Sequence, residues 1–355
     1  MSIEREQILN RVSQARVTMV VGASDTGKTT LIKSLAFEIN KFGHTCGIVD
    51  ADMGQSDIGP PTTIGLGEFY DPSKNVNHFE VKGIYFVGSI TPKGYLLPTV
   101  VGTKIMVDKA LKLGFDHVLI DTTGLIQGSL GRTLKEHKIE LVNPDLIIIL
   151  QRENECEYLI KRFKAISNHH IIVMKPSEEV RNKSPAERRE YRERSLQAYF
   201  FNSKLKKLNL KGFYLLDIPL FSGNPLSEKE KNYLSQKIDQ ELLWAESQGE
   251  EIHLVALDSI KNLVEKPPKN DIGRRLLFAY TPSEFEDILV GLYNRAGECY
   301  SLGIVRKIDF ATQQVEIEVA EDKEEPVGIK FSRCRINQNG SVYFLPRRNL
   351  IKGWL

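Results

Sequence analysis

The sequence predicts an α/β fold, with a mostly parallel sheet flanked by helices and a smaller β-rich domain at the C-terminal end. Short apolar runs of strand length alternate with amphipathic segments over the first two thirds of the chain. From about residue 250 the pattern changes to short alternating runs divided by polar turns, as in DILVGLYNRAGECYSLGIVRKIDFATQQVEIEVAE. A chain of 355 residues is long enough for two cores. We therefore expect one domain over residues 1–245 and a second over 246–355.

The candidate strands are seven apolar runs. In chain order they read VTMVVG, CGIVDAD, IYFVGSI, HVLIDTTG, LIIILQ, HIIVMKP and GFYLLDIP. Strands covered on both faces lack alternation, so nearly continuous apolar runs are typical of a parallel sheet. The segments between them predict helices over Thr29–Phe42, Leu97–Leu113, Cys156–Ile166 and Pro185–Phe201.

The composition is that of a folded protein. Hydrophobic residues make up 41% and charged residues 26%, which excludes a disordered or low-complexity chain. No apolar run approaches the ~20 residues that cross a bilayer, and the first residues carry charges where a signal peptide needs apolar ones. The four cysteines form no CxxC pair, so neither a disulfide framework nor a zinc site is indicated. We expect a cytoplasmic protein without a membrane partner.

The net charge is only +2, but the charge is unevenly distributed. Lys and Arg outnumber Glu between residues 152 and 211, a stretch that contains no Asp. Either a solvated helical face or a polyanionic partner explains such a run, and charge alone does not choose between them.

A phosphate-binding loop follows the first predicted strand and opens the first predicted helix. The stretch GASDTGKT fits the pattern GxxxxGK[ST], which predicts a P-loop NTPase domain. Glycines let backbone N–H groups approach phosphate oxygens, and the helix N-terminus adds positive potential. Lys28 is the expected ligand of the β- and γ-phosphates, and the Thr29 hydroxyl the expected ligand of Mg²⁺. The expected nucleotide-binding residues are Gly22, Ala23, Ser24, Asp25, Thr26, Gly27, Lys28, Thr29 and Thr30.

Acidic residues follow two further strands. Asp50 and Asp52 lie at the end of the second run, Gln55 lies in the loop beyond, and Asp121 ends the strand HVLIDTTG. Ligands of doubly wound sheets bind at the carboxyl ends of the strands. Asp52 is therefore a candidate general base, and Asp50 and Asp121 are candidate metal ligands. Asp50 and Asp52 have a structural alternative, in which they cap the glycine-proline loop or reach Mg²⁺ only through water.

Taken together, these stretches resemble the polynucleotide 5′-hydroxyl kinases. The matching segments are GASDTGKT, DADMGQ, VGSITPKGY, DTTGLIQG and ERREYRERSLQAYFF. The family includes the kinase subunit of the eukaryotic pre-mRNA cleavage factor and nucleolar rRNA-processing kinases. The resemblance covers roughly residues 15 to 225, and the segment beginning DILVGLYN looks like the family's C-terminal β domain.

The resemblance implies a function and roles for particular residues. It implies Mg²⁺-dependent transfer of the ATP γ-phosphate to the 5′-hydroxyl end of RNA or DNA, with Asp52 as base and Gln55 positioning that end. The charged segment 181–202 corresponds to the family's lid, whose arginines close over the transferring phosphate. Arg188 and Arg192 stand four residues apart and share a helical face. A purely structural helix is the alternative.

One motif departs from the family. Eukaryotic members have TxGW, with a tryptophan that packs on a nucleobase, where this chain has Thr122-Thr123-Gly124-Leu125. We expect Thr122, Gly124 and Leu125 to bind substrate, although Leu125 is alternatively a core residue behind the loop.

Other functions remain possible on the sequence alone. A regulatory P-loop NTPase that acts on a protein partner is the main alternative, and it predicts hydrolysis without an acceptor. A metallochaperone-type GTPase fits less well, because Lys175-Pro176-Ser177 stands where a guanine-reading NKxD is needed. A non-enzymatic nucleic-acid binder leaves the phosphate loop without a use.

Overall fold

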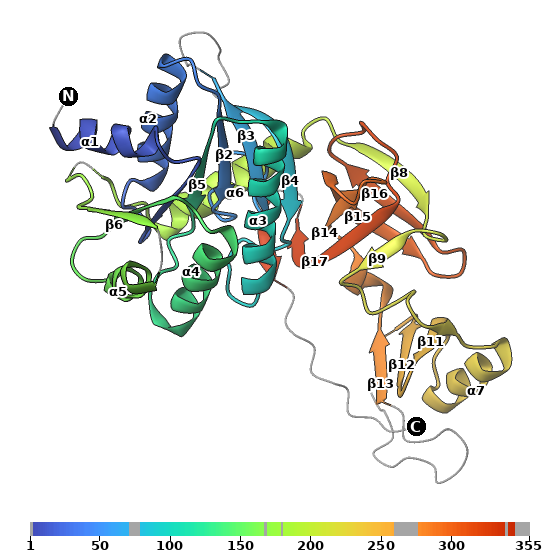
Figure 1. Cartoon of the computed structure of the whole chain (residues 1–355). Coiled ribbons are helices and arrows are strands. Elements are labelled where there is room, and N and C mark those ends of the chain that lie inside the picture. The colour runs from blue at the N-terminus through green and yellow to red at the C-terminus, as the bar shows by residue number, and fades with distance from the viewer. Residues whose placement is uncertain are drawn as a thin grey trace. The chain divides into compact units, whose positions relative to one another are not determined.

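The computed structural model describes residues 3–70, 79–166, 169–178, 180–258, 276–337 and 340–344 (Figure 1). The chain divides into two compact units, Met1–Ala198 and Tyr199–Leu355. The strands and the hydrophobic core of each unit are described separately below. None of the helices in the described ranges combines the length and the apolar character needed to cross a membrane.

The first unit is a sheet of seven strands. In spatial order they are β4 (Phe79–Phe86), β3 (Thr63–Phe69), β2 (Cys46–Ala51), β5 (His117–Thr122), β1 (Val17–Gly22), β6 (Leu146–Leu150) and β7 (His170–Met174). The run from β2 to β7 is parallel, whereas β3 and β4 are antiparallel additions at one edge. The predicted α/β sheet is confirmed. Strand β3 was not predicted, because its sequence TIGLGEF is glycine-rich and not a continuous apolar run.

Helices cover both faces of this sheet (Figure 1). One face packs on α1 (Ile3–Val12) and α2 (Lys28–Lys41). The other packs on α3 (Leu96–Leu113), α4 (Gly128–Val142) and α5 (Glu157–Ile166). Strand β1 shows the alternation. Val17, Met19 and Val21 face the core under α3, α4 and α5, whereas Val20 faces the core under α1 and α2. The predicted helices α2, α3 and α5 agree with the structure to within a residue.

The sixth helix of this unit, α6, begins at Pro185 and ends at Phe200. Its sequence is strongly charged, and only Leu196 is buried. A helix with so little apolar surface is held mainly by polar contacts, which the site description gives below.

The second unit contains two sheets. Its larger sheet is formed by β8 (Lys204–Asn209), β16 (Gln314–Val319), β15 (Cys299–Asp309), β14 (Ile288–Tyr293), β17 (Gly328–Ile336), β18 (Val342–Phe344) and β9 (Tyr214–Leu216). Its smaller sheet contains β10 (Asn224–Pro225), β11 (Leu242–Gln248), β12 (Glu251–Ala256) and β13 (Leu276–Tyr280). Two helices complete the unit, α7 (Glu228–Ile238) and the short 3₁₀ helix η1 (Pro282–Phe285). The predicted β-rich C-terminal region is confirmed.

The division between the units differs from the expected boundary at 245/246. Strand β8 pairs antiparallel with β16 along its whole length, from Asn209 opposite Gln314 to Lys204 opposite Val319. The run GFYLLDIP, expected in the first sheet, contributes β9 to the second unit, where it pairs with β17. Residues 199–245 therefore belong with the C-terminal strands, and the boundary lies at 198/199.

Candidate active site

The phosphate loop joins β1 to α2. Two of its residues have left-handed backbone conformations, Asp25 with φ 53° and Gly27 with φ 82°. Gly22 lies against β6, where a Cβ atom would come within 2.6 Å of the Leu150 carbonyl oxygen. The Lys28 side chain is buried, and its Nζ donates to the Ala23 carbonyl at 2.7 Å. The loop therefore closes on itself around a lysine whose charge is turned toward the loop.

The loop forms one end of a pocket of about 750 Å³. From the predicted nucleotide-binding set, Ser24 to Thr30 line this pocket, whereas Gly22 and Ala23 do not. The acidic loop after β2 lines it as well, through Asp52, Gln55 and Asp57. The segment after β7, including Lys175, Pro176 and Ser177, completes the lining. One cavity thus joins a phosphate loop to a carboxylate loop.

Asp121 meets the start of α2 at the carboxyl end of β5. Its Oδ2 accepts a hydrogen bond of 2.5 Å from the Thr29 hydroxyl, while its buried Oδ1 has no hydrogen-bond partner. Burial raises the pKa of Asp121 to about 6, against the lowering effect of the Lys28 charge. A hydroxyl and a carboxylate with a free oxygen suit Mg²⁺, which usually takes few protein ligands alongside substrate phosphates. Within the described residues there is no group of three or more His, Cys, Asp or Glu that could hold a metal.

Asp50 holds the loop that follows it. Its Oδ1 accepts the Asp52 N–H, and its Oδ2 accepts the Ser56 hydroxyl and the Asp57 and Ile58 N–H groups. Burial raises the pKa of this carboxyl, and the charge of Asp121 acts in the same direction. Since both oxygens are occupied by the loop, the geometry favours the structural alternative for Asp50 over a role as metal ligand.

Asp52 and Gln55 lie on that loop and face the pocket. Asp52 is partly exposed, and its Oδ1 accepts the Gly54 N–H at 3.2 Å. The Gln55 side chain accepts a hydrogen bond of 3.3 Å from Lys183 Nζ. Asp50 thus fixes the backbone, and Asp52 is the carboxylate presented to the cavity.

Helix α6 lies against both loops. Arg188 Nη2 donates to Asp25 Oδ2 of the phosphate loop at 2.5 Å. Tyr191 donates to the Ser56 carbonyl at 2.9 Å and to Asp57 Oδ1 at 3.0 Å on the carboxylate loop. Helix α6 therefore contacts both the phosphate loop and the loop after β2.

The arginines of α6 fall into two groups. Arg188 and Arg192 are partly buried, and burial lowers the pKa of Arg192 while the charges of Glu193 and Asp52 oppose that effect. Arg189 and Arg194 are exposed and pair with Glu193 and Glu190 of the same helix. Sequence reasoning did not select Tyr191 or Lys183, although a tyrosine within an otherwise charged helix was a usable signal.

The segment after β5 contains the three expected substrate-binding residues. Thr122 is fully buried and its hydroxyl donates to the Val20 carbonyl at 2.8 Å, so it is unavailable to substrate and that expectation needs correction. Gly124 lies against the phosphate loop, where a Cβ atom would come within 2.2 Å of Ser24 Oγ. Leu125 is half-buried. Gly124 therefore sets the close approach of two loops, and Leu125 keeps some exposed surface.

Two fully buried lysines of α4 lie behind this segment. Lys135 Nζ donates to the Thr123 carbonyl at 2.6 Å, and Lys138 Nζ has no hydrogen-bond partner. Burial lowers the pKa of both, that of Lys138 to about 8. Residue type alone gave no sign of this burial, because a lysine at a core position looks in the sequence like a lysine on a solvated face.

We expect Lys138→Met to raise the melting temperature at neutral pH. The folded pKa near 8 lies below that of a free lysine, 10.5, so the buried charge costs stability in full below pH 8. The upper limit of this cost is about 3 kcal/mol. As pH rises from 8 to 10.5 the unfolded state binds more protons than the folded one, and the advantage of methionine shrinks to nothing.

The measurement is thermal unfolding of both proteins between pH 7 and 11. Lys112→Met, at an exposed position of α3, is the matched control and should change the melting temperature little. A lower melting temperature for Lys138→Met at pH 7 would mean that the ammonium has a net favourable environment.

Comparison with known proteins gives concordant findings. Residues 22–202 match the family model described as mRNA cleavage and polyadenylation factor CLP1 P-loop. The chain is similar to the polyribonucleotide 5′-hydroxyl-kinase of Pyrococcus abyssi, with 32% identity over 96% of this chain and 92% of the relative. The corresponding protein of Pyrococcus furiosus is 35% identical over 91% of this chain and 88% of its own. That of Methanocaldococcus jannaschii is 34% identical over 94% of this chain and 90% of its own.

A solved structure shares the fold. The structure described as the wild-type Clp1p–Pcf11p complex matches with a TM-score of 0.61 at 13% identity. The match covers 94% of this chain and 78% of that one. Sequence and fold comparisons therefore agree over nearly the whole chain.

Proposed function

The chain belongs to the CLP1 P-loop family, and we propose that it is a kinase that transfers the γ-phosphate of ATP to the 5′-hydroxyl end of RNA. The observation that carries the proposal is that the phosphate loop, Asp52 and Gln55 line the same pocket, while Arg188 of α6 contacts Asp25 of that loop. Phosphate transfer requires ATP and the attacking hydroxyl to be held side by side, and this cavity is lined both by the loop that would bind ATP and by the loop that carries Asp52 and Gln55. The relatives from Pyrococcus and Methanocaldococcus are named polyribonucleotide 5′-hydroxyl-kinases.

Donor binding falls to the phosphate loop. Lys28 and the loop amides would hold the β- and γ-phosphates. The Thr29 hydroxyl and the free oxygen of Asp121 would hold Mg²⁺, which neutralises phosphate charge when bound. Pro176 and Val180 give the lining of the pocket apolar surface suited to a nucleotide base.

Acceptor activation falls to the carboxylate loop. Asp52 would take the proton of the 5′-hydroxyl as its oxygen attacks the γ-phosphorus in line, and the proton remains on the carboxylate. Gln55 would position the hydroxyl end. Arg192 would neutralise charge on the transferring group, because guanidinium matches phosphate oxygens in a planar fork. Most of the acceleration then comes from positioning and electrostatics.

The names of the relatives specify polyribonucleotides, so RNA is the primary acceptor we propose, and DNA is a second acceptor of the same chemistry. The main competing function, a regulatory NTPase acting on a protein, uses the phosphate loop but has no need of Asp52 beside it.

We expect label from γ-labelled ATP to appear on a 5′-hydroxyl oligoribonucleotide. A strand that already carries a 5′-phosphate should receive none, because only a free hydroxyl can attack. The same assay with the DNA oligonucleotide ranks the two acceptors, and omission of Mg²⁺ should abolish transfer. ATP consumption that is equal with and without oligonucleotide would instead favour the regulatory NTPase.

A further inference from the structure

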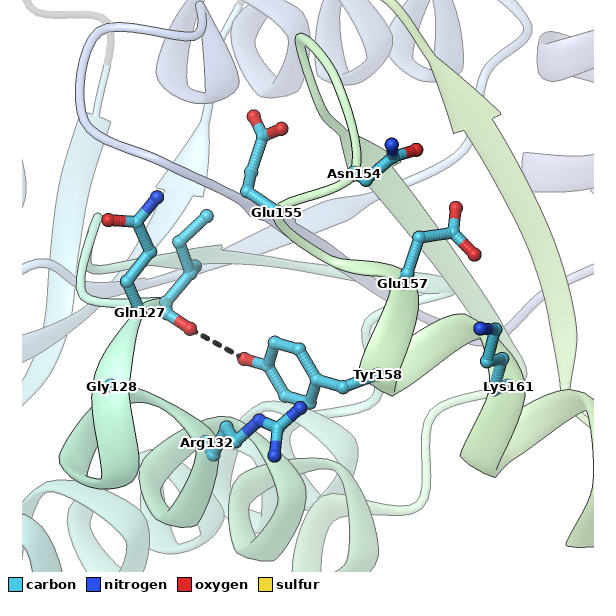
Figure 2. A pocket seen from close by; sticks show the side chains of 9 residues that line it. Gln127, Gly128, Arg132, Asn154, Glu155, Glu157, Tyr158 and Lys161 are labelled. Atoms are coloured by element: carbon cyan, nitrogen blue, oxygen red, sulfur yellow. Dashed lines mark hydrogen bonds between the residues drawn. The ribbon is translucent and has the colours of Figure 1, made fainter.

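A second pocket, of about 330 Å³, lies between the start of α4 and the start of α5 (Figure 2). It shares no lining residue with the pocket of the phosphate loop. Figure 2 shows polar side chains arranged around its opening from both helices and from the loop before α5. The lining residues are Ile126, Gln127, Gly128, Arg132, Asn154, Glu155, Glu157, Tyr158 and Lys161. None of them has a role in the transfer chemistry proposed above.

A flat, fixed surface forms one wall of this pocket. The Arg132 guanidinium lies 4.8 Å from the centroid of the Tyr158 ring. The Tyr158 hydroxyl donates to the Ile126 carbonyl at 2.8 Å, which holds the ring in place. Guanidinium planes and aromatic rings are the groups on which unpaired nucleobases stack.

The remaining lining has hydrogen-bonding capacity without surplus charge. Two cations, Arg132 and Lys161, are matched by two carboxylates, Glu155 and Glu157. A phosphate group would need an excess of positive charge, so this lining disfavours it. The Gln127 and Asn154 amides each carry a donor and an acceptor, the combination that pairs with the edge of a base.

The pocket also lies beside the site of transfer. Gln127 follows Gly124 by three residues, or at most about 11 Å of chain, and Gly124 packs against Ser24 of the phosphate loop. On the other side, Arg152 Nη2 donates to the Asp25 carbonyl at 2.5 Å while its backbone N–H donates to Glu155 at 2.7 Å. Both walls of the pocket are thus continuous with segments that contact the phosphate loop.

We propose that this pocket receives a nucleobase of the acceptor strand, within the first few nucleotides of its 5′ end. The inference rests on the proposed function and deepens it. It says which residues bind the acceptor strand when the 5′-hydroxyl of that strand lies at Asp52. The base lies against Arg132 and Tyr158, and Gln127 and Asn154 hydrogen-bond its edge. Since these residues are away from the reacting atoms, they act on acceptor binding and not on turnover.

The test uses one 5′-hydroxyl oligoribonucleotide and versions that lack a single base at the first, second or third nucleotide. With the unaltered protein, loss of the seated base should raise KM about tenfold, within the range of one stacked base, and leave kcat unchanged. Arg132→Ala and Asn154→Ala should raise KM for the complete strand. In these variants the base-lacking strand should no longer be penalised, because the base has lost its site.

Controls separate this result from general effects. Lys164→Ala, at an exposed position of α5 outside the pocket, should behave like the unaltered protein. A base penalty that persists undiminished in Arg132→Ala and Asn154→Ala would overturn the proposal. A weaker salt dependence of binding in Arg132→Ala, with the base penalty intact, would also overturn it, because it would identify a phosphate contact.

Binding of the same strands, followed by fluorescence anisotropy, distinguishes failure of the pocket from failure of the kinase. If no strand is phosphorylated but binding still loses affinity with the missing base and with Arg132→Ala, the pocket stands and the proposed function fails. If phosphorylation occurs without any base penalty, the proposed function stands and the pocket assignment fails.

Discussion

Asp52→Asn should lower the rate of phosphate transfer by about 10²- to 10⁴-fold while ATP affinity changes little. Asparagine keeps the size of the side chain and can still accept the Gly54 N–H, so the loop keeps its shape. It cannot take up the proton of the attacking hydroxyl. The loss should therefore appear in kcat, measured under saturating ATP and oligonucleotide.

Two variants show whether that loss is specific. Asp108→Asn removes a carboxylate from the exposed side of α3 and should leave transfer unchanged. Lys28→Ala should damage ATP binding as well as turnover, because Lys28 belongs to the loop that would hold the donor. Near-normal turnover in Asp52→Asn would remove Asp52 from the mechanism.

Arg192→Ala should reduce kcat on the order of 10³-fold, the scale of an arginine that meets the transferring phosphate. The side chain is partly buried, and Asp52 is among the charges that influence it. Arg192→Lys keeps the charge but loses the planar fork, so it should recover only part of the rate. Oligonucleotide affinity should change little in either variant.

Arg194→Ala is the matched control, since Arg194 is exposed on the same helix and pairs with Glu190. Its kcat should equal that of the unaltered protein. If Arg192→Ala weakens oligonucleotide binding and leaves kcat intact, helix α6 is a nucleic-acid clamp and not a catalytic lid.

Local sequence patterns were sufficient for the parts of this protein that are local in the chain. The phosphate loop, the strand before it and helix α2 are contiguous, so spacing and periodicity carry them. The facing of α6 is also local, because residues four apart share a side, and Arg188 and Arg192 lie inward while Arg189 and Arg194 are exposed.

What could not be predicted depends on partners far apart in the chain. Thr122 belonged to an expected substrate motif, and only the structure shows that its hydroxyl donates a hydrogen bond to the Val20 carbonyl on the neighbouring strand. Lys135 and Lys138 are buried because α4 packs on the sheet, a fact that their residue type argues against. The sequence pattern assigned Asp50 to a metal, but in the structure the backbone of its own loop donates to it, and Asp52 is the carboxylate that lines the pocket.

The pairing of β8 with β16 has a consequence for how the chain is made. Their paired residues are separated by more than a hundred positions, Asn209 opposite Gln314 and Lys204 opposite Val319. At about 5–20 residues per second, a ribosome needs roughly 5 to 20 seconds to supply the partner after β8 has been synthesised. During that interval β8 is an unpaired strand, the kind of segment that promotes aggregation. Its lysines at 204, 206 and 207 carry like charges, which disfavour pairing of β8 with the β8 of a second chain before β16 has been synthesised.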